Sequence, residues 1–288
     1  MSWRTVVISN NAKLDYQLGY MIVRRAETIK VHLSEVSTLI IETTAVSLTA
    51  VLLSELTKRK VKVIFCDEKR NPSSELIPYY GSHDTSVKIR NQMAWTEEIK
   101  AAVWTEIVSE KIHQQEEVLR SYNRDEADML HHYIEELEFG DETNREGHAA
   151  KVYFNALFGM DFTRSAENSI NAALNYGYSI ILSMFNREIV SNGYITQIGI
   201  FHDNMFNQFN LGSDLMEPFR PVVDRKVKKI NPIKFEREEK LEVLHVLQED
   251  VMISGRHELL DNSIKLYCRS VFDALNEHDP SLIKFFSI

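Results

Sequence analysis

The hydrophobic periodicity of this sequence changes once, near residue 84, and this change constrains the fold more than any other feature. Before it, short segments rich in Val, Ile, Thr and Tyr alternate apolar and polar positions, as strands of an antiparallel sheet do. These segments are residues 5–9, 13–17, 20–24, 28–33, 38–42 and 61–66, with 76–80 as a further candidate strand. Residues 47–60 instead place Val51, Leu52 and Leu56 at helical spacing, so one helix is expected among the strands.

After residue 84 the apolar spacing is helical, and no proline occurs between Gly81 and Pro218. We expect helices at residues 85–96, 97–121, 124–138, 143–157, 165–191, 199–209, 213–228, 236–252 and 256–276. The predicted fold class is α+β: a small N-terminal antiparallel β domain with one helix, residues 1–84, followed by a larger all-α C-terminal domain, residues 85–288. A chain of 288 residues is long enough for two such domains.

The composition is that of an ordinary folded protein and argues against several other classes. No apolar run reaches the ~18 residues of a membrane span, and the start at Met1 lacks the basic and apolar segments of a secretory signal. Cys66 and Cys268 are the only cysteines, too few for a disulfide framework. We therefore expect a cytoplasmic protein with no membrane partner. The sequence also lacks the P-loop, GxSxG and CxxC motifs of common nucleotide, acyl-transfer and redox enzymes.

The net charge of -9 seems to argue against a nucleic-acid partner, but its distribution does not. Residues 116–142 contain ten acidic residues and only two arginines, so this one stretch accounts for almost all of the excess. Basic clusters lie elsewhere, at Arg24-Arg25, at residues 58–60 and at residues 225–229. Local patches, rather than the total charge, decide whether a phosphate backbone can dock.

Glu146 opens the first motif that could carry chemistry, Glu-Gly-His-Ala-Ala-Lys-Val-Tyr-Phe. On a helix, Glu146 shares a face with Ala149, Ala150 and Tyr153, so its carboxylate lies over small residues that permit close approach by a ligand. The alternative is a solvated acid in the first turn, where the helix dipole favours negative charge.

His202 follows Gly199-Ile200-Phe201 and precedes Asp203 and Asn204 in the second motif. A neutral imidazole can bind a divalent metal through one nitrogen while a carboxylate or carbonyl holds the other. Taken alone, an isolated histidine of this kind is more often a structural residue.

Asp214 and Glu217 lie three residues apart in the third motif, Ser-Asp-Leu-Met-Glu-Pro-Phe-Arg-Pro. This spacing suits a capping box, which would be a structural role. Pro218 and Pro221 fit a helix poorly, however, and Pro221 favours extended geometry at the preceding Arg220. Charged residues in a segment with unfavourable local geometry are more typical of sites than of ordinary surfaces.

Residues 168–178 form the fourth motif, in which Asn171 and Asn175 share a helix face and Gly177 lies in the helix interior. Buried amides need hydrogen-bond partners, and an interior glycine costs ~1 kcal/mol relative to alanine. We interpret this segment as one that packs against another polar element.

The four motifs, in this order and over nearly the whole chain, resemble those of the CRISPR-associated adaptation integrases, metal-dependent enzymes that insert new spacers into CRISPR arrays. The resemblance implies that Glu146, His202 and Glu217 bind one Mg²⁺ or Mn²⁺ and are the catalytic residues. It suggests supporting positions around them, and further helpers with less support. The supporting positions are Tyr153, Asn171, Tyr176, Asp214 and Arg220, and the helpers are Asp203 and Asp224.

The proposed ligand set agrees with this chemistry independently of the resemblance. Two carboxylates and an imidazole, without a thiolate, suit a hard or borderline divalent ion that keeps coordination positions free for phosphate oxygens and water. Phosphoryl transfer depends mostly on positioning and charge neutralisation. The expected reaction joins the 3'-hydroxyl ends of captured DNA fragments to the repeat by transesterification, without a nucleotide cofactor.

The resemblance also implies partners: a double-stranded DNA fragment, the CRISPR repeat, and a homodimer whose pairs are bridged by a small companion adaptation protein. Other adaptation or effector proteins could join them, because the short chain and the Glu-Gly-His-Ala-Ala motif are similar to the subtype that accompanies a large single-chain effector nuclease. The β domain is expected to form the dimer and to contact duplex DNA. The residues expected to bind DNA are Arg220, Arg225, Lys226, Lys228, Lys229, Lys58 and Arg59.

Two other functions remain open on the sequence alone. The same ligands could activate water, which would make the protein a nuclease for branched or damaged DNA. A non-catalytic DNA-binding scaffold whose site has lost its metal is the second alternative.

Overall fold

The structure is a computed structural model that describes residues 4–79 and 81–288. It separates two compact units, Met1–Gly81 and Ser82–Ile288. This division falls three residues before the boundary expected from the sequence, 84/85. The arrangement of strands followed by a mostly helical region gives the α+β class that was predicted.

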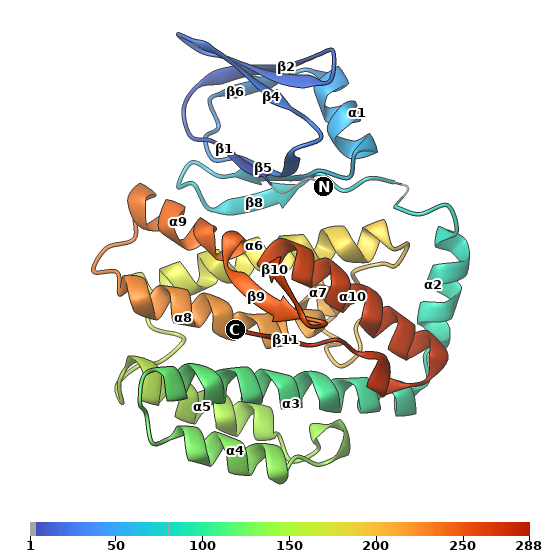
Figure 1. The fold of residues 1–288 in the computed structure, drawn as a ribbon, viewed down its shortest axis with the longest axis vertical. Coiled ribbons are helices and arrows are strands. Elements are labelled where there is room, and N and C mark those ends of the chain that lie inside the picture. Colours follow the sequence, from blue (N-terminus) through green and yellow to red (C-terminus); the bar gives the residue numbers. More distant parts are fainter. Residues whose placement is uncertain (1–3, 80) are drawn as a thin grey trace. The chain divides into compact units, whose positions relative to one another are not determined.

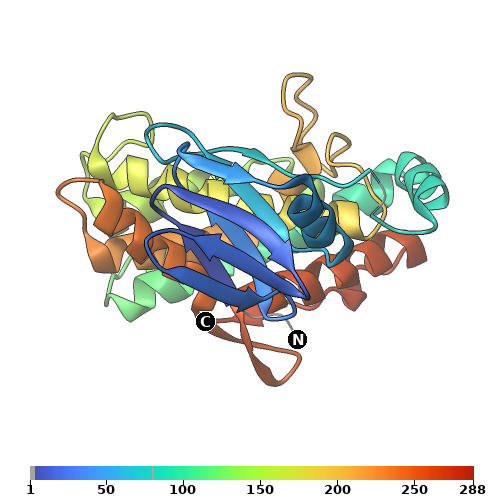
Figure 2. The same cartoon turned by 90° about the horizontal axis from the view of Figure 1, so that it is seen from above.

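The N-terminal unit contains two four-stranded sheets, with strand orders β1-β5-β7-β8 and β4-β3-β2-β6. Figure 2 looks onto this unit and shows its strands in blue with α1 beside them. The elements are β1 (Arg4–Ile8), β2 (Ala12–Gln17), β3 (Tyr20–Arg24), β4 (Thr28–His32), β5 (Val36–Ile41), β6 (Val46–Leu48), α1 (Ala50–Lys58), β7 (Lys62–Cys66) and β8 (Pro72–Glu75).

The β2–β3 hairpin shows how the local sequence determines the register. Gln17 pairs with Tyr20, so only Leu18 and Gly19 form the loop. Both have positive φ, 47° and 88°. Positive φ at both loop residues is the geometry of a type I′ turn, whose twist matches that of the flanking strands. The hairpin then places Leu14 and Met21, both fully buried, on the inner face.

The prediction of an antiparallel domain is correct for β2–β3–β4 and for β7–β8. It is wrong for three pairs, because β1 with β5, β5 with β7 and β2 with β6 are parallel. Helix α1 lies between β5 and β7 in the chain, and a helical crossover returns the second strand parallel to the first. The last strand is Pro72–Glu75, earlier than the candidate 76–80.

The core of this unit is apolar and includes the inner side of α1. Leu39 of β5 and Leu52 and Leu56 of α1 are fully buried in one cluster. Thr49 caps α1 by accepting a hydrogen bond from the backbone N–H of Leu52.

The C-terminal unit is built around two long helices, α3 (Glu97–Ser121) and α6 (Ser169–Ser191), which Figure 1 shows in green and yellow. Helix α3 packs against α4, α5 and the 3₁₀ turn η2, whereas α6 packs against α7, α8, α9 and α10. The other helices are α2 (Thr85–Ala94), α4 (Ala127–Glu135), α5 (Arg145–Phe158), α7 (Asn210–Leu215), α8 (Arg220–Ile230), α9 (Arg237–Leu244) and α10 (Leu260–Glu277). Short 3₁₀ turns are η1 (Phe139–Asp141), η2 (Glu217–Phe219), η3 (His245–Gln248) and η4 (Pro280–Leu282).

The C-terminal unit is not purely helical, as the sequence had predicted, because it has a small sheet of order β10-β9-β11. Its strands are β9 (Asp250–Ile253), β10 (Arg256–Leu259) and β11 (Phe286–Ser287). The hairpin β9–β10 turns at Ser254 and Gly255, which again both have positive φ. This two-residue turn ends the helix predicted at 236–252 and delays the start of α10.

The predicted helix at 199–209 is also wrong, because these residues form an irregular loop. Side-chain amides of Asn204, Asn207 and Asn210 bind backbone groups within and beside the loop. Such local bonds offer the backbone an alternative to the helical pattern. The loop therefore has a defined conformation without regular secondary structure.

Gly177 explains why a glycine lies in the middle of α6. A Cβ atom at this position would collide with the side chain of Val223 on α8. The glycine therefore permits close packing of two helices. Among the described residues, none of the helices combines the length and the apolar character needed to cross a lipid bilayer.

Candidate metal centre

The structure brings Glu146, His202 and Glu217 into one region of the C-terminal unit, from α5, the 199–209 loop and η2. One ammonium group, that of Lys111 on α3, contacts both carboxylates: it donates to Oε1 of Glu146 and lies 2.5 Å from Oε2 of Glu217. His202 is close enough for both acids to act electrostatically on its ring. The expected ligands thus surround a point that already holds a positive charge.

The first turn of α5 fixes the position of Glu146. Asn144 caps the helix by accepting from the N–H of Gly147. The buried carboxylate of Asp141 accepts from the N–H groups of Arg145, at 2.6 Å, and Glu146, at 3.2 Å. Asp141 was not singled out from the sequence, although an acid just before a helix start is a common capping signal.

Glu217 lies in η2, between α7 and α8, and is 3% exposed. Pro218 falls in the first turn of η2 and Pro221 in the first turn of α8, where a missing N–H has no cost. The prolines thus break the predicted helix 213–228 into pieces and turn Glu217 inward. Arg220 donates from Nε to Oε1 of Glu217 at 2.9 Å. Burial raises the pKa of Glu217, but Arg220 and Lys111 lower it more, so this carboxylate is held ionised.

Asp214 fixes His202 and the loop that carries it. Its carboxylate is fully buried and accepts from the N–H groups of Ile200, Phe201 and His202, at 2.6, 3.0 and 3.1 Å. It also lies 2.5 Å from Nδ1 of the His202 ring. A Cβ at Gly199 would collide with the Asp214 carboxylate, so only glycine permits this approach.

The Asp214 contact determines which nitrogen of His202 is free to bind a ligand. With Nδ1–H donated to the carboxylate, Nε2 keeps its lone pair for a metal. The hydrogen bond to Asp214 raises the pKa of His202, and burial opposes this shift only in part. The ring is also held edge-on to Trp104, with the centroids 5.8 Å apart.

Lys111 is the site residue that sequence reasoning missed. It lies on the buried face of α3, which also carries Trp104, Val108 and Gln115. Burial lowers the pKa of Lys111, but the charges of Glu217 and Glu146 outweigh it, so the pKa is raised. A lysine at a core-facing helix position seldom occurs without an acidic partner, and that spacing was the signal available in the sequence.

The donor set fits a divalent metal ion. Glu146 and Glu217 offer carboxylate oxygens to a shared cation, and Nε2 of His202 is a third donor, which is the mixture Mg²⁺ or Mn²⁺ accepts. Within residues 4–79 and 81–288, however, no three His, Cys, Asp or Glu side chains already converge as a preformed metal cluster. The Lys111 ammonium lies at the shared point instead.

Behind Glu217, a second polar group connects α8 with α5 and α6. The hydroxyl of Tyr178 donates to the buried Asp224, and Tyr153 faces the same carboxylate. Burial raises the pKa of Asp224 to about 6, although the tyrosines lower it in part. The guanidinium of Arg220 lies 4.8 Å from the Tyr178 ring centroid, so this network continues to Glu217.

The other expected supporting residues do not share this arrangement. Asn171 donates to the carbonyls of Thr163 and Ala166 and so holds the turn before α6. The Tyr176 ring packs against Phe235 at 5.6 Å. Asp203 is exposed on the loop. Of the supporting positions, Asp214 and Arg220 touch the expected ligands directly.

The expected DNA-binding residues differ in how freely their charges face solvent. Arg220 is paired with Glu217, as described above. Arg225 and Lys226 share Glu249, at 3.7 and 3.1 Å, and Lys58 and Arg59 share Glu55, at 2.8 and 3.8 Å. Lys228 lies over the Phe158 ring, 5.7 Å from its centroid, and Lys229 is exposed.

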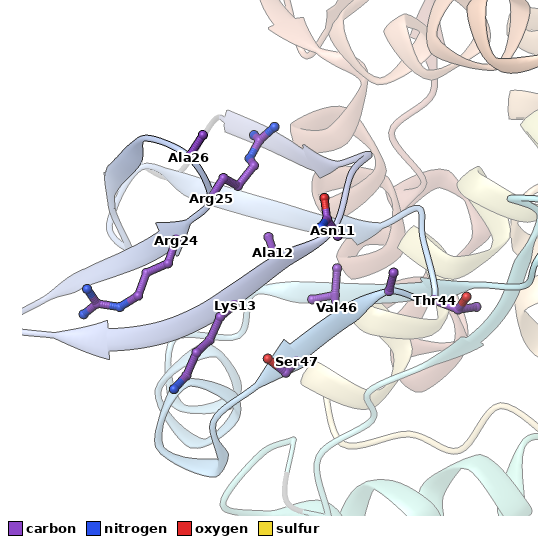
Figure 3. Close-up of a pocket in the computed structure, with 10 residues that line it drawn as sticks. Asn11, Ala12, Lys13, Arg24, Arg25, Ala26, Thr44, Val46 and Ser47 are labelled. Atoms are coloured by element: carbon purple, nitrogen blue, oxygen red, sulfur yellow. The ribbon is translucent and has the colours of Figure 1, made fainter.

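The N-terminal unit contains a further basic surface, an open groove of about 580 Å³ between β2, β6 and the end of β3. Figure 3 shows the residues that line it, among them Lys13, Arg24 and Arg25. Arg24 donates to Asp15 at 2.6 Å, so its charge is partly neutralised. Lys13 was not singled out from the sequence, because only the topology brings β2 and the β3–β4 turn together.

Comparison with known proteins gives consistent matches. The family model described as CRISPR associated protein Cas1 matches residues 5–249. The "CRISPR-associated endonuclease Cas1" of Neisseria meningitidis serogroup C is 35% identical over 229 residues, which cover 79% of this chain and 75% of that protein.

Two solved structures have the same fold. A casposase bound to integration product superposes with a TM-score of 0.76 at 18% identity and covers 97% of this chain and 92% of that chain. A Cas6-RT-Cas1–Cas2 complex has a TM-score of 0.74 at 18% identity and covers 97% of this chain but 36% of that larger chain.

Proposed function

The chain belongs to the Cas1 family of CRISPR-associated proteins, and on this premise we propose that it is the metal-dependent DNA integrase of CRISPR adaptation. The single observation that carries the proposal is the cation site described above: two carboxylates, Glu146 and Glu217, share one positive charge beside His202. We propose Mg²⁺ or Mn²⁺ as the cofactor. A Cas1 relative bears the name endonuclease, which is consistent with chemistry at phosphodiester bonds.

In the proposed reaction, the 3'-hydroxyl of a captured DNA fragment attacks a phosphodiester of the repeat. One P–O bond forms to the fragment's 3'-oxygen, one P–O bond breaks, and the leaving 3'-oxygen of the repeat strand takes up a proton. The number of phosphodiester bonds is unchanged, so no nucleotide cofactor is required. A divalent ion, when bound, supplies a Lewis acid that polarises the phosphate and stabilises the attacking and leaving oxygens.

The residues of this chain would hold and orient the ion and exclude alternatives. Glu146 and Glu217 supply oxygen ligands, and His202 supplies Nε2. Asp214 keeps the His202 ring in one tautomer and one orientation, which is the role carboxylates commonly have behind metal-bound histidines. Arg220 keeps the Glu217 carboxylate in place and ionised.

DNA contact is proposed for two surfaces: the exposed end of α8 around Lys229, and the groove of the N-terminal unit with Lys13 and Arg25. The double-stranded fragment and the repeat are the proposed substrates, and the cytoplasm the proposed location. Dimerisation through the β unit and bridging by a small companion protein remain part of the proposal. A solved assembly that contains this fold is titled a Cas1–Cas2 complex, which supports such a partnership. Association with a single-chain effector nuclease is the subtype proposal.

The principal alternative is a nuclease that uses the same residues to activate water. The two reactions differ in whether the 3'-end of the fragment matters. The test incubates a short duplex with a labelled repeat-bearing target, the companion protein and Mn²⁺, and resolves the strands on a denaturing gel. We expect a longer, joined strand that disappears when the duplex has dideoxy ends. Equal target cleavage with both kinds of end, without a joined strand, would overturn the integrase proposal in favour of the nuclease.

A further inference from the structure

Lys111 raises a question that the proposed function does not answer. A divalent ion bound by Glu146 and Glu217 would need the oxygens that the lysine ammonium now contacts. Two cations cannot occupy one point between the same carboxylates, because their mutual repulsion in a buried site is strong. Metal binding and the observed lysine position therefore exclude each other.

The surroundings show why the lysine occupies this point in the metal-free protein. Glu217 is 3% exposed and Lys111 is 6% exposed, so both charges have lost most of their hydration. A buried carboxylate without a partner is strongly unfavourable. Arg220 contacts only Oε1 of Glu217, on the side away from Glu146. Among the contacts of the described residues, Lys111 is the one cation that reaches both acids.

We propose that Lys111 is a positioning residue that occupies the cation site of the free protein and must swing away before the metal ion binds. This inference rests on the proposed function, since it takes Glu146 and Glu217 as ligands. The lysine preserves the spacing of the carboxylates without metal, and it lowers the affinity for metal by competition. Its flexible four-carbon side chain permits the movement, which a rigid, planar guanidinium would not.

The competition has a definite size in terms of populations. If the lysine fills the site in more than about nine molecules out of ten, the apparent metal affinity is reduced about tenfold or more relative to a site that is always open. Replacing Lys111 with an uncharged residue of similar length removes the competitor and leaves the ligands. Metal affinity should then rise, although one polar partner of the site has been lost.

The experiment measures Mn²⁺ binding to the full chain without DNA, by calorimetry, and the melting temperature with and without Mn²⁺. We expect Lys111→Met to bind Mn²⁺ about tenfold more tightly than the unmodified protein. Its metal-free form should melt lower, and its metal-induced rise in melting temperature should be larger. Lys111→Gln serves if Lys111→Met does not fold, because its amide can still donate to one carboxylate.

Two control variants make the result specific. Lys226→Met removes a comparably buried lysine, paired with Glu249 at 3.1 Å, and should leave Mn²⁺ affinity unchanged. His202→Ala removes a proposed ligand without touching Lys111 and should weaken binding in either background. Lys111 variants that bind Mn²⁺ no more tightly, while His202→Ala weakens binding, would overturn the inference and leave the proposed function intact. Mn²⁺ binding that is indifferent to His202→Ala would overturn the proposed metal site, and the inference with it.

Discussion

The two units of the molecule bury charge in different ways. In the N-terminal unit the main cluster is apolar, and the buried Glu42 and Lys62 each have a single partner, Arg70 and Glu75. In the C-terminal unit, one ammonium is shared by two carboxylates. The Glu217 end of this group continues through Arg220 and Tyr178 to Asp224.

The difference indicates what each unit is built for. Paired charges at the margin of an apolar core are compatible with a stable scaffold. A continuous buried network of like and unlike charges usually costs stability relative to apolar packing, so its presence is more easily explained by a site than by folding. The following predictions test this contrast, from the largest expected effect to the smallest.

The largest effect is expected for the three proposed ligands. Glu146→Ala, His202→Ala and Glu217→Ala should each reduce strand joining with Mn²⁺ by about 10³-fold or more, because each removes a donor to the ion that stabilises charge in the transition state. Each variant should remain folded without metal, which circular dichroism and thermal melting would measure. A variant of this set that joins strands at the unmodified rate would remove its residue from the ligand set.

Leu39→Ala should have the opposite profile. Leu39 is fully buried between the strands of the N-terminal unit, and loss of such a side chain reduces the free energy of unfolding by roughly 2 to 5 kcal/mol. Mn²⁺ affinity should not change, because the proposed ligands all lie in the other unit. Urea denaturation and Mn²⁺ calorimetry on the same sample would measure both. If Mn²⁺ affinity fell as far as in Glu217→Ala, the division of roles between the units would be wrong.

Asp224 should make stability depend on pH. Its pKa in the folded protein is raised from 3.8 to about 6. Below about pH 4 the carboxyl is protonated in both states and its contribution is fully present, and this contribution is lost as the pH rises through 6, because only the unfolded chain ionises easily. The loss is on the order of 2 to 3 kcal/mol. Asp224→Asn should flatten this part of a stability profile measured from pH 4 to 7, and an unchanged slope would show that another group is responsible.

The smallest effects concern DNA affinity and ask which unit contributes more per charge. Lys13→Ala with Arg25→Ala should weaken binding to duplex DNA several-fold and reduce its salt dependence by up to ~0.9 per lost phosphate contact. Replacing the four α8 cations, Arg225, Lys226, Lys228 and Lys229, should cost less per charge, because two of them share Glu249. Fluorescence anisotropy at several salt concentrations measures both, with Lys58→Ala, paired to Glu55, as the control. A steeper loss per charge on α8 would reverse the assignment.

The sequence predicted much of the fold because period-2 and helical spacing survive in single segments. The β2–β3–β4 strands and the helices α3, α5 and α6 were predicted within a few residues. The parallel pairing of β5 with β7 could not be read from alternation, since a strand's periodicity is the same whichever way its neighbour runs. The loop at 199–209 was mistaken for a helix because its asparagines act through side-chain bonds that periodicity does not include.

For the site, the sequence supplied the ligand candidates but not what holds them. Glu146, His202 and Glu217 were found by resemblance, and Asp214 was one of several acids of similar standing. Only the three-dimensional contacts distinguish Asp214, which holds His202, from Asp203, which is exposed. Lys111 lies 35 residues from Glu146 in the chain, so no local motif could connect them.

The most direct test of the central claim is an anomalous diffraction map at the manganese edge from crystals grown with Mn²⁺. The account predicts one strong peak per chain, within bonding distance of carboxylate oxygens of Glu146 and Glu217 and of Nε2 of His202, with the Lys111 ammonium displaced from between the acids. A peak bound by other residues, or saturating Mn²⁺ with no peak here and Lys111 still bridging the carboxylates, would contradict it.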